Sequence, residues 1–337
     1  MENSKIQWTD HTFNPWRICS KVSEGCRNCY AAELSHRFGW GDYADHVERQ
    51  RTSPMVWSFV ERLNAKAAKL STQSPLSSQP KVFCGSLCDW LDPRVPIAWL
   101  VDLLNLIDAT PHITWQLLTK RPEQWAMRIA QAAHYSPLAN RWLNSSGVFV
   151  GLDHPPENVW FGVTAENQAR ANERIPLLLD IPAAKRFLSV EPMLGPVDLG
   201  DVQGLDVLNG LVSTEVCHQV DWVIFGGESG NQARECDIMW IYEGVRQCQR
   251  ANVPVFVKQL GRRSICLNAN LLDWPDHVPL FAHGEGAAGC RPQLSDPKGG
   301  NLADFPTELQ VRQFPMARSR SISSPHPRSF CHPVPMS

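Results

Sequence analysis

Residues 158–190 have the sequence NVWFGVTAENQARANERIPLLLDIPAAKRFLSV, in which two apolar segments flank a stretch with helical spacing. The segments 158–163 and 186–190 are short, apolar at successive positions and rich in β-branched or aromatic residues. That composition is typical of a strand covered on both faces. The stretch 166–179 between them is predicted to be a helix. Strand, helix and strand in this order predict parallel strands joined by a helical crossover.

The same alternation extends along most of the chain. Similar apolar segments predict strands at 81–84, 114–118, 221–225 and 253–257, and a shorter one is expected at 6–8. Helical spacing recurs at 97–107, 123–133 and 239–248. Most predicted strands end in polar or glycine-containing residues, as strands do at the active face of a barrel. The expected fold is therefore α/β, a full or partial (β/α) barrel of six to seven parallel strands. An open, doubly wound sheet is the alternative.

Length and composition indicate an ordinary globular protein. The chain has 337 residues, of which 43% are hydrophobic and 20% charged, with a formal net charge of −2. This balance excludes a wholly disordered chain and a global positive field that attracts nucleic acid or an anionic membrane. No apolar run reaches the ~18 residues of a membrane-spanning helix, and residues 1–5 lack the apolar core of a signal peptide. We expect a cytoplasmic protein without a membrane partner, in which the 11 cysteines stay reduced.

Three regions are expected along the chain. Residues 1–262 form the barrel, and residues 263–316 form an irregular C-terminal extension packed on it. Residues 317–337 are rich in Ser, Arg and Pro without periodicity, which predicts a disordered tail. Inside the barrel, 71–80 is a polar linker, and the insertion 200–219 replaces an expected helix.

The most specific motif is CSKVSEGCRNC, with thiols at Cys19, Cys26 and Cys29. Gly25 allows the loop to fold back so that Cys19 joins the close pair. Three thiolates are one short of closing a tetrahedral zinc site or a four-iron cluster. Either a fourth side chain completes a structural zinc site, or one iron of a cluster stays open to a small molecule. Candidates for the fourth ligand are His11, His36 and Cys88.

The place of the motif in the chain favours the open iron. The cysteines follow a predicted first strand and precede an amphipathic helix at Tyr30–Phe38, which ends at Gly39. The carboxyl end of a barrel strand is where barrel active sites lie. Zinc ribbons instead favour hairpin knuckles.

Six segments carry a further likeness. They are WTDHTFNPWRICSKVSEGCRNCYA (8–31), LLTKRP (117–122), NVWFGVTAEN (158–167), RFLSVEPMLGPVD (186–198), DWVIFGGESG (221–230) and VPVFVKQLG (253–261). Together they resemble the three-cysteine-motif phage-protein family, which is largely uncharacterised and is regarded as a distant relative of radical-SAM enzymes. The resemblance extends from about Trp8 to Phe314.

The resemblance implies a specific chemistry. Cys19, Cys26 and Cys29 would hold a [4Fe–4S] cluster whose open iron binds S-adenosylmethionine for reductive cleavage. The first gap of the motif is six residues here, whereas radical-SAM enzymes usually have three. An electron donor and a partner protein encoded nearby are implied, and the phage context makes nucleic acid or a nucleotide a candidate substrate. The alternative function is a non-catalytic, zinc-stabilised module that binds nucleic acid or a partner protein.

Polar residues that follow the predicted strands should share one rim with the cysteines. An aminoacyl cofactor needs an acceptor for its ammonium, a donor for its carboxylate and partners for two ribose hydroxyls. The residues that we expect to bind it are Lys120, Arg121, Glu166, Ser189, Glu191, Gly226, Gly227, Glu228, Ser229 and Lys258. Two structural alternatives stay open, because residues 226–230 also suit a tight turn, and Glu191 also suits an ion pair with Lys120 or Lys258.

The other cysteines and the tryptophans give weaker signals. Cys84 and Cys88 are spaced for a second metal site, but Cys84 falls inside a predicted strand and is expected in the core. Most of the 13 tryptophans are expected in the core as well. Six cysteines show no ligand spacing and are predicted to be structural: Cys217, Cys236, Cys248, Cys266, Cys290 and Cys331.

Overall fold

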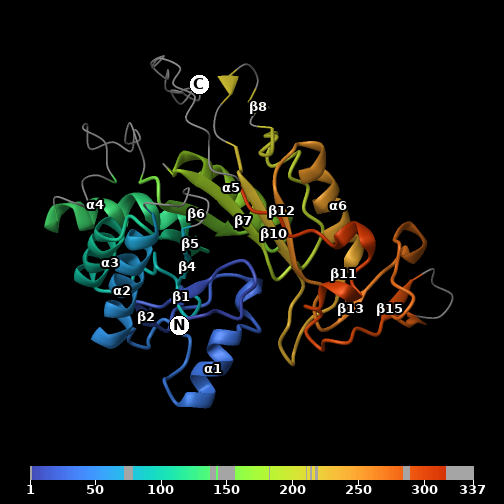
Figure 1. Ribbon diagram of the computed structural model, residues 1–337, viewed down its shortest axis with the longest axis horizontal. Coiled ribbons are helices and arrows are strands. Elements are labelled where there is room, and N and C mark those ends of the chain that lie inside the picture. The colour runs from blue at the N-terminus through green and yellow to red at the C-terminus, as the bar shows by residue number, and fades with distance from the viewer. Residues whose placement is uncertain are drawn as a thin grey trace.

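A curled sheet of seven parallel strands forms a half-barrel at the centre of the protein (Figure 1). The computed structural model describes residues 2–71, 79–136, 142, 156–181, 183–209, 211–212, 215–216, 219–283 and 289–315. The strands in spatial order are β1 (His11–Phe13), β4 (Lys81–Cys84), β5 (Thr114–Thr119), β6 (Val159–Thr164), β7 (Lys185–Val190), β10 (Trp222–Gly226) and β12 (Val255–Gln259). Every neighbouring pair is parallel, which confirms the predicted partial barrel.

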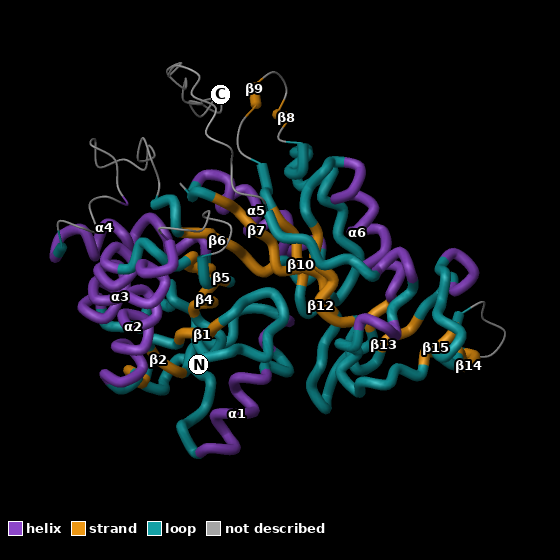
Figure 2. Tube along the Cα trace, viewed as in Figure 1, coloured by secondary structure: helices purple, strands orange, loops and turns teal. Residues whose placement is uncertain are grey.

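Helices connect most of the strands and cover the outer face of the sheet (Figure 2). They are α2 (Pro54–Ser71), α3 (Ile97–Ala109), α4 (Trp125–Tyr135), α5 (Gln168–Asp180) and α6 (Ile238–Arg250). The sequence predicted the last four to within a few residues and missed α2. Figure 1 shows α2, α3 and α4 grouped beside the first strands and α6 beside the last ones. The crossover from β7 to β10 differs, because its described residues contain only turns and the short strands β8 (Leu211–Val212) and β9 (Glu215–Val216).

Alternation along the strands gives the sheet two apolar faces. One set of strand residues packs with the helices in the main core, for example Trp115, Phe161 and Phe225. The other set forms a separate cluster with Trp8 on the face that the helices do not cover, and its strand residues are Phe83, Phe187, Trp222, Ile224 and Phe256. Strands with both faces buried explain the nearly continuous apolar segments in the sequence.

The strand expected at 6–8 is wrong, and Trp8 shows why. The first strand lies at His11–Phe13 instead, where it pairs with β4. The ring of Trp8 fills the inner face of the half-barrel, 4.6 Å from the ring centre of Phe83 and 6.2 Å from that of Trp222. Trp8 is therefore apolar because its side chain packs on the concave face of the sheet, and it does not belong to a strand.

One close contact between strands gives a test of this packing. Gly162 lies opposite Phe187, and a Cβ at position 162 would meet the Phe187 ring at 2.5 Å. Gly162→Ala should therefore cost about 1–3 kcal/mol of unfolding free energy, because the buried ring must leave its position. Urea unfolding checks this, with Gly195→Ala as control, since the nearest atom there lies at 3.8 Å. Equal midpoints for the two variants would contradict the described packing.

The C-terminal extension consists of short strands and turns beside the half-barrel (Figure 2). In it, β13 (Ser264–Ile265) pairs with β11 (Cys236–Asp237), and β14 (Leu280–Ala282) forms a hairpin with β15 (Cys290–Pro292). Val257 N–H donates to the carbonyl of Val311 at 2.9 Å, and Gln313 N–H donates to that of Val255 at 2.9 Å. These bonds cover the outer edge of β12, which is otherwise open to pairing.

Parts of the predicted organisation lie outside the described residues. The predicted disordered tail at 317–337 and most of the linker at 71–80 belong to them. The boundary at residue 262 stays a prediction. Within the described part of the chain, none of the helices has the length and apolar character needed to span a bilayer.

Candidate metal centre

The cysteine motif forms a loop at the carboxyl end of β1. Strand β2 (Trp16–Arg17) first pairs with β3 (Gln50–Arg51), and the loop then leads to α1 (Tyr30–Phe38), as predicted. Cys26 ends the short 3₁₀-helix η1 (Glu24–Cys26), and Cys29 is the N-cap residue of α1. All three motif cysteines are half-buried, whereas five other described cysteines are buried: Cys84, Cys236, Cys248, Cys266 and Cys290.

The backbone is strained directly before the first cysteine. Ile18 has a φ of 73° and is fully buried. A β-branched residue in the left-handed region costs about 1–3 kcal/mol and persists only where its surroundings impose it. Such residues cluster at functional sites. The start of the loop is therefore held in a constrained conformation.

Two cations from the carboxyl end of β5 accompany the thiols. Burial opposes the charge on Lys120, but Cys26, Glu166 and Cys29 outweigh burial and raise the pKa of this lysine. Its Nζ also donates to Thr164 Oγ1 at 3.3 Å. Burial and then Asp89 raise the pKa of the Cys19 thiol, which Arg121 opposes. Thiolates at all three positions would therefore lie beside positive charge.

The described part of the chain holds no ready-made site for one metal ion. Within it, no group of three or more His, Cys, Asp or Glu side chains is placed to hold such an ion. Sulfurs around one zinc lie within ~4 Å of one another, because each Zn–S bond is about 2.3 Å long. In a four-iron cluster each cysteine binds a different iron, so the sulfurs need not converge on one point. The described side chains of the loop therefore do not by themselves decide between the two kinds of metal centre.

The three candidates for a fourth ligand have different surroundings. The Nδ1 atom of His11 accepts a hydrogen bond from Asn3 N–H at 3.1 Å, and its ring lies 5.8 Å from Phe59. His36 is exposed in the last turn of α1. Burial, then Cys84 and then Cys19 raise the pKa of the Cys88 thiol. Of these candidates, Cys88 is the one with an electrostatic link to a motif cysteine.

Glu166, at the carboxyl end of β6, holds the middle of the cysteine loop. Ser23 Oγ donates a short hydrogen bond to Glu166 Oε1, and Arg174 Nη1 donates to Glu166 Oε2 at 2.8 Å. A Cβ on Gly25 would come within 2.7 Å of Glu166 Oε1, so the loop touches this carboxylate. Burial opposes the ionisation of Glu166, but Lys120, Arg174 and Ser23 outweigh burial and lower its pKa. The Glu166 carboxylate is therefore charged, and Ser23 and Arg174 both donate hydrogen bonds to it.

Glu228, after β10, holds the end of the same loop. Asn28 Nδ2 donates to Glu228 Oε2 at 3.1 Å, and Arg234 Nη2 donates to Glu228 Oε1 at 2.8 Å. Arg234 also reaches the loop, because its Nη1 donates to the carbonyl of Glu24 at 2.9 Å. Burial opposes the ionisation of Glu228, but the bonds from Arg234 and Asn28 lower its pKa below the usual value. Two carboxylates thus hold one loop.

Arg121 holds the start of the loop from β5. Its Nη2 donates to both the carbonyl and the Oγ of Ser20 at 2.8 Å, and its Nη1 lies 3.2 Å from Asp89 Oδ2. Arg49 reaches Ser20 from the other side, with Nη2 3.3 Å from its Oγ, while its Nε donates to Asp92 at 2.8 Å. These buried guanidinium groups complete the support of residues 20–28.

The family model described as "Protein of unknown function (DUF5131)" matches residues 3–279, which include the whole half-barrel and the cysteine loop. The chain belongs to this family. The match ends inside the C-terminal extension, beyond the expected boundary at 262. Neither a curated protein nor a solved structure matches the chain.

The glycines of this DUF5131 chain at the end of β10 serve close packing. A Cβ on Gly227 would meet the carbonyl oxygen of Leu260 at 2.3 Å, and one on Gly226 would meet Glu191 Cδ at 3.2 Å. Glu191 is also engaged, because Lys258 Nζ donates to its Oε1 at 2.6 Å. The ion pair expected as one alternative for Glu191 therefore forms with Lys258.

The predicted rim residues of the DUF5131 chain fall into two groups. Arg121, Glu166 and Glu228 contact the cysteine loop directly, which the sequence did not indicate. Their partners Ser20, Ser23, Asn28, Arg174 and Arg234 were missed, since single polar residues in loops and helices carry no recognisable spacing. Among the hydrogen bonds of the described residues, none joins Lys120, Ser189, Glu191, Ser229 or Lys258 to the loop. Ser189 is buried beside Thr164 in the sheet register.

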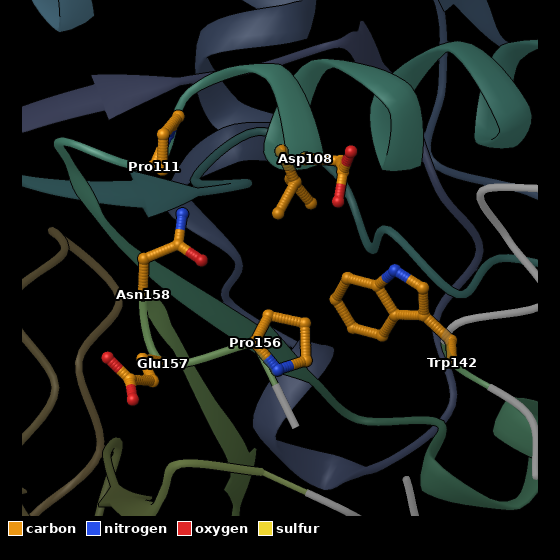
Figure 3. A pocket seen from close by; sticks show the side chains of 7 residues that line it. Asp108, Pro111, Trp142, Pro156, Glu157 and Asn158 are labelled. Atoms are coloured by element: carbon orange, nitrogen blue, oxygen red, sulfur yellow. The ribbon is translucent and has the colours of Figure 1, made fainter. Parts of the chain in front are cut away.

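A hollow of about 330 Å³ lies at the opposite end of the strands (Figure 3). It is lined by residues before β5 and β6, among them Asp108, Trp142 and Asn158. Parallel α/β folds bind ligands at the carboxyl ends of their strands, so we place the functional site at the cysteine loop and not here.

The support from Glu228 can be tested through thiol reactivity. Glu228→Gln removes the charge that Asn28 and Arg234 share, so the loop should open more often. Alkylation of Cys26 and Cys29 in the metal-free protein should then accelerate about tenfold, since bonds to charged groups contribute ~1.5–3 kcal/mol. The exposed Glu243, on α6, gives the control Glu243→Gln. Unchanged alkylation rates would show that Glu228 does not hold the loop.

Proposed function

We propose that this protein is an iron–sulfur enzyme of radical-SAM type, in which Cys19, Cys26 and Cys29 hold a [4Fe–4S] cluster. The observation that carries the proposal is the placement of all three thiols on one supported loop at the carboxyl end of the half-barrel. The other described cysteines are more buried, apart from Cys88. Lys120 supplies positive charge beside Cys26 and Cys29, which favours ligands in the thiolate form.

Separate residues position the loop and receive the small-molecule cofactor in this proposal. Glu166, Glu228 and Arg121 fix the loop through the bonds given above and are positioning residues. Lys258 and Glu191 form a half-buried ion pair at the carboxyl ends of β12 and β7. A zwitterionic amino acid group suits such a pair, with its carboxylate on the lysine and its ammonium on the glutamate. Lys120 is a second donor for that carboxylate.

The cluster and S-adenosylmethionine supply the reaction itself, which is reductive cleavage of the sulfonium for hydrogen abstraction from a substrate. An electron donor is required for this step. Nucleic acid or a nucleotide is the substrate class that we propose, on the phage-type resemblance of the six segments. The aromatic cluster that includes Trp8 and Trp222 fills the inner face of the half-barrel, and Trp222 lies at the amino end of β10.

Anaerobic reconstitution with iron and sulfide tests the proposal. The expected product is a brown protein with about four irons per chain and broad absorption near 400 nm, on the order of other four-iron clusters. A colourless protein that keeps about one zinc per chain and takes up no iron would instead support a non-catalytic, zinc-stabilised module. Zinc and iron contents are measured on the same sample, so each outcome decides between the iron–sulfur enzyme and the zinc-stabilised module.

Lys120→Met separates cofactor binding from cluster binding. The variant keeps all three thiols, so its iron content should stay at the wild-type value. Loss of a charged donor should weaken S-adenosylmethionine binding about 10- to 100-fold, because such bonds contribute ~1.5–3 kcal/mol. Lys69→Met, on the exposed side of α2, is the matched control. Equal affinity in both variants, measured by anaerobic equilibrium dialysis, would remove Lys120 from the cofactor site.

A further inference from the structure

Two cysteines that the sequence predicted to be structural lie directly opposite each other in the C-terminal extension. Cys266 N–H donates to the carbonyl of Cys290 at 2.8 Å, and Cys290 N–H donates to that of Cys266 at 2.8 Å. The two residues thus form a hydrogen-bonded antiparallel pair. Cα atoms in such a pair are about 5.5 Å apart, which is the commonest separation across a disulfide. Their side chains lie on the same face of the ladder.

We propose that Cys266 and Cys290 are a redox-active pair that a low-molecular-weight disulfide converts to an intramolecular disulfide. Both residues are buried, at 0% and 7% exposure, and both are reduced as described. The pair is distinct from the cysteine loop, so the inference does not depend on the proposed function.

The surroundings decide how fast the pair reacts. Burial raises the pKa of Cys266 to about 12, and burial also raises the pKa of Cys290. Each thiol also contributes to the pKa shift of the other. Since the thiolate is the nucleophile, both cysteines exchange slowly at neutral pH. The pair therefore responds to sustained oxidation and not to a brief pulse.

Oxidised glutathione is the oxidant that accepts the two electrons of this reaction. The thiolate of one cysteine attacks oxidised glutathione, which forms a mixed disulfide and releases one reduced glutathione. The second cysteine then attacks the protein sulfur of that mixed disulfide, which forms the Cys266–Cys290 bond and releases the second reduced glutathione. The two thiol protons end on the two glutathione molecules, and the two electrons reduce the original disulfide.

The bond would join two parts of the extension. Cys266 follows β13, which pairs with β11, and Cys290 begins β15 in the hairpin with β14. β11 comes two residues after Arg234, which holds both Glu228 and the cysteine loop. The disulfide would thus fasten the outer hairpin to the strand pair beside this support. A disulfide between Cys266 and Cys290 would raise the free energy of unfolding, chiefly because it restricts the unfolded chain between the two residues.

Peptide mapping of the full-length protein tests the pair. The reduced protein is incubated with oxidised glutathione over a time course, and a second sample is expressed in an oxidising cytoplasm, so that slow access to buried thiols is not limiting. Trypsin leaves both cysteines in Ser264–Lys298, and cleavage before Asp273 and Asp276 then separates them. The expected result is two fragments joined by a disulfide, with Cys236 and Cys248 still alkylated. The melting temperature should rise by a few degrees in the wild type and in Cys248→Ser, but not in Cys266→Ser.

Two results would overturn the inference. In one, Cys266 and Cys290 both stay alkylatable in the oxidising cytoplasm while the motif cysteines become oxidised. In the other, either cysteine is found joined to a different cysteine. Because iron and cofactor binding are not read out, neither result bears on the proposed function.

Discussion

Cys26→Ala should lose nearly all of the iron that the wild-type protein takes up on anaerobic reconstitution. The alanine removes one of three thiolate ligands, and two cysteines leave a four-iron cluster with two irons unprotected by the chain. The thiol is half-buried on a supported loop, so the variant should fold with little change in melting temperature. Iron and sulfide contents after gel filtration give the result.

Cys248→Ala is the matched control for this prediction. Cys248 is buried on α6, away from the cysteine loop, and its loss should leave iron uptake unchanged. Wild-type iron content in Cys26→Ala would contradict the assignment of the motif as the cluster site. Loss of iron in both variants would point to a folding defect, which the melting temperatures of the two variants would reveal.

Arg174→Met should lower the unfolding free energy of the metal-free protein by about 3–5 kcal/mol. Arg174 Nη1 lies 2.8 Å from Glu166 Oε2, and the side chains are 2% and 0% exposed. Removing Arg174 leaves the buried Glu166 carboxylate without the guanidinium that hydrogen-bonds it, which is costly even though Lys120 remains. The double variant Arg174→Met with Glu166→Gln should recover part of the loss, because no unpaired carboxylate remains. Urea unfolding of the wild type, Arg174→Met, Glu166→Gln and the double variant gives the coupling energy. A wild-type midpoint for Arg174→Met would contradict the account.

The ionisation of Glu166 determines how the unfolding free energy changes with pH. The pKa of Glu166 in the folded protein lies below its value in the unfolded chain, which is about 4.3. Its contribution to stability is therefore complete above that pH and is lost as the pH falls through the folded-state pKa. The midpoint difference between wild type and Glu166→Gln should shrink between about pH 5 and pH 3.

Strand order and type were predictable because both faces of the sheet are buried. Each strand then forms a continuous apolar segment, and the helices between them keep their own spacing. Trp8 shows the limit of that logic, since an apolar residue that fills the inside of a curved sheet resembles one that belongs to a strand. Helix α2 was not predicted, although Pro54 suits the first position of a helix and the polar segment 71–80 follows it.

The candidate site was predictable in position but not in detail. The spacing of Cys19, Cys26 and Cys29 and the rule that sites lie at carboxyl ends of strands both indicate this loop, and its role as a metal centre stays a prediction. Glu166 and Glu228 were expected to bind a cofactor, yet they hold the cysteine loop through Ser23 and Asn28. That role depends on contacts between residues 143 or 200 positions apart, which no local pattern carries.

Product analysis of the reduced, reconstituted protein with S-adenosylmethionine tests the proposed catalysis most directly. We expect 5′-deoxyadenosine and methionine in equal amounts when dithionite, the iron–sulfur cluster and all three cysteines are present together. Omission of dithionite or replacement of Cys26 should abolish both products. A protein that assembles its full complement of iron and sulfide, binds S-adenosylmethionine and still forms neither product would contradict the account.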